Sequence, residues 1–331
     1  MAEFDRDETT RAPLTEEGRS AKYRARISQR EQTAQRLLLA AAEEAYSGDL
    51  DVNWDAPVES DLDWFPERLS SLYGSPEWKR MSTAQRRELG RRELVNVLTF
   101  GMRAEAAMTM LMFRSIAEAD DLMGDITRYT LKAIQEETRN TSMFSRVINK
   151  TGLPINRKYA EGWLISELVV FIPAGLITDG LILMLQEAIH SYAVAMASDS
   201  SLQPHVRQTM RIHEMADRRH LEFSRHEFRR TAQASRRVSR IVGGHVLAMA
   251  AARLYPMVLN GMVYPPIGIP ARRGLRIARS GDQYPMRARA LTDSFISEAK
   301  EAGLFRTPTE RLLLRRGKVW PDSVPNTAPS R

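Results

Sequence analysis

One stretch of the sequence decides the expected fold, residues 212–220, which read IHEMADRRH. His213, Asp217 and His220 are spaced i, i+4 and i+7, so a helix would place all three on one stripe. Two imidazoles and a carboxylate on one face are natural donors for iron, manganese or zinc. A solvated helix face is the alternative, because charged residues such as Arg218 and Arg219 crowd the same stretch. We favour the metal site, because two of the six histidines in the chain fall on this stripe.

The sequence on either side of this stretch predicts more long helices and no strand pairs. Segments of helical periodicity end at clusters of Gly, Ser or Pro, which are typical helix stops. The predicted helices span residues 31–46, 84–119, 121–149, 158–171, 176–197, 205–232 and 235–259, with one more within 284–302. The expected fold class is therefore all-α, with four long central helices. Helical bundles build metal sites from side chains on facing helices, so inward-facing carboxylates and histidines are the residues of interest.

Composition divides the chain into three parts. Residues 1–30 have the composition of a disordered tail, and residues 31–262 are expected to form the helical di-metal domain. Three prolines between positions 265 and 270 interrupt the helical pattern. We therefore expect residues 263–331 to form a C-terminal extension that packs on, or trails from, the same domain.

Three further segments place carboxylates on apolar helix faces. Glu137 lies on a mostly apolar face, and Asn140 stands three residues later, where bundle metal motifs carry a histidine. Glu105 lies on a face rich in methionine, and Glu187 forms a Glu-x-x-His pair with His190 in a helix with little other charge. A buried carboxylate needs a partner or a metal. The alternatives are an ordinary ion pair, a carboxylate that reaches solvent, and a satisfied core histidine.

These four segments, in this order, resemble the p-aminobenzoate N-oxygenase (AurF-like) family of di-iron oxygenases, which belongs to the ferritin-like superfamily. The family carries a Glu, then Asp-Glu-x-x-His, then a third-helix Glu, then His-x-x-Asp-Glu-x-x-His. The resemblance covers about residues 89–234, and its most specific part runs from Asp199-Ser-Ser-Leu-Gln-Pro204 to His213 and His220. It implies a ferritin-like helical bundle with extra peripheral helices.

Carried over position by position, the resemblance implies a role for five residues. Glu105 would be the first terminal carboxylate, and Glu137 would bridge the two metals. His213 and His220 would be imidazole ligands, and Asp217 would stand where the family has its second bridging Glu. Aspartate is one methylene shorter than glutamate, which changes the reach of this ligand.

Two further positions depart from the family pattern. Asn140 replaces a histidine ligand. The third-helix carboxylate is Glu187, although a gap-free alignment places Gln186 at that position. His190 lies one turn along the same helix, and we hypothesise that it replaces the missing imidazole. The predicted metal ligands are therefore Glu105, Glu137, Glu187, His190, His213, Asp217 and His220, with Asn140 and Gln186 at outer or lost-ligand positions.

The resemblance implies an enzyme that activates dioxygen, its co-substrate, at two iron ions, with manganese as an alternative metal. The reaction would be N-oxygenation or hydroxylation of a small molecule, for instance an aromatic amine. Electrons would come from an external donor such as a ferredoxin or a reductase, because no flavin or nicotinamide motif is visible. We also expect a homodimer. The competing hypothesis is a degenerate ferritin-like protein with one metal or none, acting as a binding or scaffold protein, because one histidine ligand is missing.

Composition bears on the type of metal ligand, the cellular compartment, and binding to nucleic acid or membranes. The chain has no cysteine, so carboxylate and imidazole must hold any metal, and we expect a cytoplasmic protein. The net charge of +7 is spread widely and lacks a compact aromatic-basic motif, so no nucleic-acid partner is predicted. Charged residues and Pro173 interrupt the apolar run 163–197, which favours core helices and predicts no membrane partner.

Overall fold

A computed structural model describes residues 28–155 and 172–320 of the 331-residue chain. The described residues form helices and no strand, which confirms the all-α prediction. The helix predicted for residues 158–171 lies outside the described residues. The described helices are α2 (Gln29–Glu43), η1 (Glu67–Leu69), α3 (Pro76–Arg80), α4 (Thr83–Ala117), α5 (Asp125–Thr151), α7 (Leu176–Ala197), α8 (Pro204–Ala234), α9 (Arg237–Val258), η2 (Gly261–Val263), η3 (Pro265–Ile267), α10 (Ala271–Ser280), α11 (Tyr284–Ala290), α12 (Asp293–Glu301) and α13 (Pro308–Arg316).

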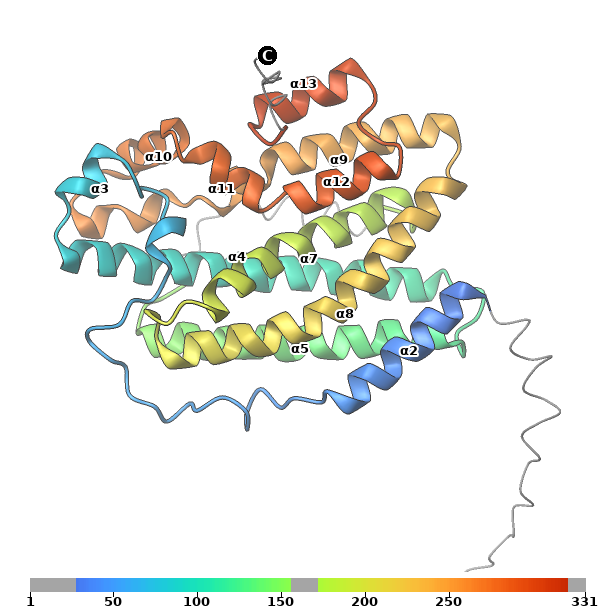
Figure 1. The fold of residues 1–331 in the computed structure, drawn as a ribbon, viewed down its shortest axis with the longest axis horizontal. Coiled ribbons are helices and arrows are strands. Elements are labelled where there is room, and N and C mark those ends of the chain that lie inside the picture. The colour runs from blue at the N-terminus through green and yellow to red at the C-terminus, as the bar shows by residue number, and fades with distance from the viewer. Residues whose placement is uncertain (1–27, 156–171, 321–331) are drawn as a thin grey trace, which may run out of the picture.

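Helices α4, α5, α7 and α8 form the central bundle (Figure 1). α4 and α5 run antiparallel to each other, and so do α7 and α8. α5 ends at one end of the bundle, and α7 begins at the other. Two antiparallel pairs joined by one long crossover are the arrangement of ferritin-like folds.

Local signals in the sequence set the ends of these helices. Ser82 caps α4, because its side chain accepts a hydrogen bond from the backbone of Gln85 and the Gln85 side chain accepts one in return. Pro204 begins α8, at a position where a helix needs no N–H donor. Gly152 follows α5 with a φ of 67°, a left-handed conformation that favours glycine. The predicted bounds of the four central helices agree with the structure to within a few residues.

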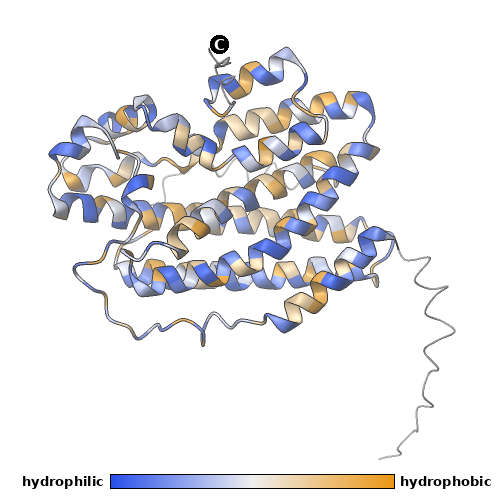
Figure 2. Ribbon diagram, viewed as in Figure 1, coloured by the Kyte–Doolittle hydropathy of each residue, from blue (hydrophilic) through white to orange (hydrophobic). Residues whose placement is uncertain are grey.

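α8 packs against α2, α5 and α7, yet much of it is hydrophilic in Figure 2, whereas α7 is largely apolar. A polar side chain that leaves water needs a hydrogen bond or an opposite charge. The buried polar residues of α8 are His205, Thr209, His213, Asp217, Arg219, His220, Ser224 and Glu227. The sequence of α8 therefore requires polar partners from the neighbouring helices.

The C-terminal helices share the main apolar core with the bundle. This core runs from Val52 to Val319 and includes Phe295 and Phe305. α9 packs on α7, and α13 packs on α9. The described part of the extension thus packs on the bundle, while the domain boundary at residue 263 stays a prediction. Sequence periodicity missed α10 and α13, because both are short and rich in arginine.

Within residues 28–155 and 172–320, two helical segments are long and apolar enough to cross a membrane by length and composition alone. They are α7 and the segment Arg237–Val263. Most of the apolar window of α7 is buried inside the fold, and somewhat less than half of the second window is. Buried core helices pass the same test, so the absence of a membrane partner stays a prediction.

Phe228 tests how strongly α8 holds the C-terminal helices. Its side chain is fully buried, and its ring centroid lies 5.8 Å from that of Phe295 in α12. We expect Phe228→Ala to lower the free energy of unfolding by about 3–5 kcal/mol, because it leaves a cavity. Phe113 on α4 is half exposed, so Phe113→Ala should cost about 1 kcal/mol or less. Denaturant unfolding followed by circular dichroism measures both, and equal losses would contradict this packing.

Candidate metal centre

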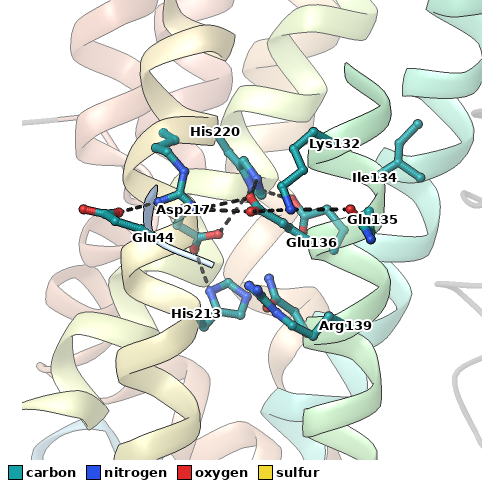
Figure 3. A network of polar contacts seen from close by, with 12 residues as sticks. Glu44, Lys132, Ile134, Gln135, Glu136, Arg139, His213, Asp217 and His220 are labelled. Carbon is teal, nitrogen blue, oxygen red and sulfur yellow. Dashed lines mark hydrogen bonds and ion pairs between the residues drawn. The ribbon is translucent and has the colours of Figure 1, made fainter. Parts of the chain in front are cut away.

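The stripe predicted on residues 212–220 faces the middle of the bundle. His213, Asp217 and His220 lie on successive turns of α8, and each is only 1% exposed. Figure 3 shows these three side chains between α8 and α5. The stripe is therefore buried, and the alternative of a solvated helix face does not apply.

Glu105 of α4 closes one side of this stripe. Its Oε1 atom lies 3.0 Å from Nε2 of His213, and its Oε2 atom accepts a hydrogen bond from the Thr141 hydroxyl. The His213 ring is stacked on Phe144, with ring centroids 5.1 Å apart and planes within 7° of parallel. Neighbours from α5 thus hold both Glu105 and His213 in position.

Glu137 of α5 lies where donor atoms from the other helices meet. Its Oε1 atom is 3.1 Å from Nδ1 of His220. Two groups of donors result, Glu105 with Glu137 and His213, and Glu137 with Asp217 and His220. Within each group the donor atoms lie within 4.8 Å of one another. Glu137 belongs to both groups, and a carboxylate shared between two donor clusters is suited to hold two metal ions side by side.

Burial makes these carboxylates hard to ionise unless a positive charge lies close. Burial raises the pKa of Glu105 to about 7, although the hydrogen bond and charge of His213 oppose the rise. Burial alone would also raise the pKa of Asp217, but the positive charge of His213, helped by His190 and His220, lowers it to about 2. The cluster therefore depends on neighbouring cations.

In the protein alone, the two imidazoles supply that positive charge. Burial disfavours the charged form of His220, but hydrogen bonds to Glu136 and Glu137 outweigh it and raise its pKa to about 9. Burial likewise opposes the charge of His213, but Asp217 raises the pKa of that ring well above its ordinary value. Metal ligation requires a neutral imidazole, so a divalent cation would displace these protons and supply the charge itself.

The donor set fits divalent metals such as iron and manganese. It consists of carboxylate oxygens and imidazole nitrogens, without thiolate. Nδ1 of His213 and Oδ2 of Asp217 form a buried ion pair at 2.8 Å, but neither atom makes a hydrogen bond with a described residue. A bound cation would satisfy such buried atoms, which lack hydrogen bonds.

Sequence reasoning missed a chain of ion pairs behind His220 (Figure 3). Nε2 of His220 donates to Glu136 at 2.9 Å, and Glu136 also accepts from Arg219 at 3.2 Å. Arg219 in turn donates to Glu44, just after α2, and Lys132 lies 3.5 Å from Glu136. Such partners orient a ligating imidazole and decide which ring nitrogen faces the metal. The one available signal was that Glu136 stands at the Asp of the Asp-Glu-x-x-His pattern.

Two of the predicted ligands lie outside both donor groups. Glu187 is buried but accepts a 3.0 Å hydrogen bond from Nε of Arg225. Nδ1 of His190 is 3.7 Å from Oδ2 of Asp217, too far for a hydrogen bond, and its side chain is partly exposed. The structure thus does not bring Glu187 to the other donors and places His190 at their edge. A ligand role for either residue stays a prediction.

Asn140 and Gln186, the two outer or lost-ligand positions, are both almost fully buried. The amide nitrogen of each has no hydrogen-bond partner among the described residues, whereas the Gln186 oxygen accepts a 2.6 Å bond from Ser224. An amide can offer a neutral oxygen to a metal but no negative charge. Asn140 and Gln186 therefore reduce the negative charge available to a metal, but the five converging donors are still present.

A cavity of about 710 Å³ begins beside His220. Gln186 and Tyr129 line its inner part. It extends along the bundle to the end at which α4 stops and α7 starts, where Ala119 and Gly175 line it. A small molecule could thus reach the candidate centre from that end of the bundle.

Adjacent arginines on α8 allow a test of the ion pairs behind His220. Arg219 is buried between Glu44 and Glu136, whereas Arg218 is 67% exposed and, within the described part of the chain, pairs with Glu214 alone. We expect Arg219→Ala to lower the free energy of unfolding by about 3–5 kcal/mol, because it leaves buried Glu136 short of positive charge. Arg218→Ala should change it by about 0.5 kcal/mol or less. Chemical denaturation compares the two variants, and a similar loss in both would refute the assignment.

Comparison with known proteins identifies the family and the fold. The family model described as P-aminobenzoate N-oxygenase AurF matches residues 27–303. Two solved structures of R2-like ligand-binding oxidase variants with a Mn/Fe cofactor share the fold, each at 12% identity. One has a TM-score of 0.51, with 85% of this chain and 95% of that chain covered, and the other has 0.50, with 92% and 100% covered. No curated protein matches the chain. The family match spans well over half of the sequence, and the chain therefore belongs to the p-aminobenzoate N-oxygenase AurF family.

Proposed function

We propose that this protein is a di-metal oxygenase that uses dioxygen to N-oxygenate or hydroxylate a small organic substrate such as an amine. The observation that carries the proposal is the place of Glu137 in both buried donor groups. Ionised carboxylates buried this deeply are stable only beside cations. Two converging donor groups offer binding places for two metal cations. Membership of the AurF family supports oxygenase chemistry at such a centre.

The five converging residues divide between two metal positions. Glu105 and His213 would hold one metal, Asp217 and His220 the other, and Glu137 would contribute to both. We propose iron at both positions, with manganese at one of them as the alternative, because carboxylate and imidazole ligands suit either metal. The R2-like oxidases that share the fold carry a Mn/Fe cofactor, which supports the alternative.

The bound metals would supply the dioxygen activation that no amino-acid side chain provides. In the net reaction, one oxygen atom of O2 enters the substrate, and the other leaves as water after taking up two protons and two electrons. An external protein donor such as a ferredoxin or a reductase would supply these electrons. The chain itself would contribute a buried place for the metals and a cavity that brings the substrate to His220.

The residues around the centre would position the ligands without reacting. Glu136 holds the ring of His220 through Nε2. Burial opposes the charge of Glu136, but His220, Arg219 and Lys132 outweigh it and lower the pKa of this carboxyl to about 2. Glu136 therefore stays ionised at neutral pH and keeps Nδ1 of His220 turned toward Glu137.

Metal content per chain tests the proposal. After expression with added iron, the wild-type protein should hold about two iron ions per chain by mass spectrometry. Glu137→Gln removes the carboxylate common to both groups, so its metal content should fall by about half or more. Glu187→Gln makes the same change at a residue that pairs with Arg225, so its metal content should stay near that of the wild type.

Two outcomes would contradict this proposal. Wild-type metal content in Glu137→Gln would remove Glu137 from its shared position, whereas an equal loss in both variants would make Glu187 a ligand as well. A wild-type content near one or zero would favour the competing hypothesis, a degenerate protein of the same fold that acts by binding or as a scaffold.

Restoring the family histidine provides a second test. Asn140 is fully buried, three residues after Glu137 and on the same side of α5. We expect Asn140→His to tighten iron binding by about tenfold or more, because an imidazole is a stronger donor than an amide. Competition with a coloured chelator measures the affinity, and circular dichroism checks the fold. No gain in affinity, together with loss of metal in His190→Ala, would instead assign the missing imidazole to His190.

A further inference from the structure

The cavity beside His220 follows matching stripes on two of the central helices. The stripe on α7 consists of Gly175, Asp179, Ile182 and Gln186, and the stripe on α8 consists of His220, Ser224, Glu227 and Thr231. Residues three or four positions apart share one helix face, so each stripe lies along the cavity wall. Asp179 and Gln186 are two turns apart on α7, a separation of about 10 Å. The cavity therefore has an outer part at Asp179 and an inner part at the candidate metal centre.

The mouth of this cavity is acidic. Glu118, Asp120 and Asp121 line it and are exposed, and Glu31 lines it and is partly exposed. Glu118 pairs with Arg114, whereas the other three carboxylates form no ion pair with a described residue. Negative charge around an entrance raises the local concentration of cations and lowers that of anions.

Asp179 carries the negative charge further into the cavity. Burial, helped by the nearby charge of Glu227, raises the pKa of its carboxyl to about 6, although the positive charges of Arg230 and Arg30 oppose the rise. No described arginine or lysine lies within ion-pair distance of it. The two arginines that line the cavity, Arg30 and Arg230, both donate to Glu227. Among the described residues, the cavity thus contains a carboxyl group with no ion pair of its own, and both of its arginines are bound to Glu227.

Two buried polar groups on the cavity wall also lack partners. The Tyr129 hydroxyl and the Gln186 amide nitrogen make no hydrogen bond with a described residue, and both residues are 1% exposed. The Tyr129 ring lies against Phe223, with centroids 4.7 Å apart, so part of the wall is aromatic. Unpaired polar groups on a partly aromatic cavity wall are typical of a site for a small ligand.

From these positions we propose that the cavity binds an aromatic compound that carries a positively charged amine. The ammonium group would pair with Asp179, the ring would lie against Tyr129 and Phe223, and the group to be oxidised would lie beside His220. The oxidation rests on the proposed function, whereas the binding preference does not.

This preference is opposite to the charge of the compound for which the family is named. p-Aminobenzoate is an anion, and its carboxylate would pass four carboxylates at the mouth and meet Asp179 inside. The described part of the cavity offers that carboxylate only Arg30 and Arg230, which already donate to Glu227. We therefore expect this member of the family to select cations.

Two probes of nearly the same shape and opposite charge test the proposal. para-Aminophenethylamine is a cation at neutral pH, para-aminophenylacetate is an anion, and para-ethylaniline is a neutral control. Isothermal titration calorimetry on the full chain, with the metal content of the same sample measured, should show the cation binding about tenfold tighter than the anion or better. Equal binding, or tighter binding of the anion, would overturn the proposal.

Asp179→Asn tests the residue assigned to the ammonium group. It should weaken binding of para-aminophenethylamine by about tenfold and leave binding of para-ethylaniline unchanged. Asp55→Asn is the matched control, because Asp55 is exposed and adjacent to Ala56, which contacts Lys150 at the far end of α5. Unchanged affinity in Asp179→Asn would overturn this assignment.

A second variant, at the mouth of the cavity, tests the charge preference even if Asp179→Asn fails to fold. Asp120→Asn combined with Asp121→Asn changes exposed residues, and it should reduce the preference for the cation most strongly at low salt. An unchanged preference in this variant would count against the electrostatic argument. If the protein expressed with added iron holds no metal but still prefers the cation, the proposed function alone is refuted. If a metal-loaded sample prefers the anion, only the cavity assignment is refuted.

Discussion

Negative charge buried in the middle of the bundle is the constraint on which the rest of the structure depends. Glu105, Glu136, Glu137 and Asp217 are all buried, and four carboxylates in an apolar interior are unstable unless positive charge lies among them. α8 supplies that charge through two imidazoles and Arg219. Helix packing and electrostatics are therefore linked, because a bundle that closed without these cations would bury unpaired charge. The need for positive charge beside the buried carboxylates also explains why α8, a central helix, is largely hydrophilic.

Helix periodicity explains which part of the site could be predicted from the sequence. Positions i, i+4 and i+7 share a face in any α-helix, so His213, Asp217 and His220 had to lie together once this segment was helical. Glu105 and Glu137 showed the complementary pattern, a carboxylate on an otherwise apolar face, and a buried charge of that kind needs a partner. The same periodicity, together with capping residues, located the four central helices. The structure brings these five residues together in two groups.

Contacts between distant parts of the chain could not be predicted in this way. Arg219 pairs with Glu136, which is 83 residues away, and no local pattern links the two. On α7 the sequence left open whether Gln186 or Glu187 faces the centre. Adjacent residues on a helix point about 100° apart, so only one of the two can do so. Gln186 lines the cavity beside His220, whereas the adjacent glutamate pairs with Arg225. α7 is apolar on nearly every side, so its sequence does not reveal which face it turns to the bundle.

Three of the five converging donors stand on α8, and this has a mechanical consequence. α8 is one helix from Pro204 to Ala234, so these donors keep fixed distances along its axis and move as a rigid body. A slide of α8 by the rise of one residue, about 1.5 Å, would displace donors of both groups in the same direction at the same time. Gln203, at the start of this helix, donates to the backbone oxygens of Glu59 and Leu62 and so ties it to the loop between α2 and η1. That loop therefore helps to set the axial position of both groups at once, although it contributes no donor atom to either.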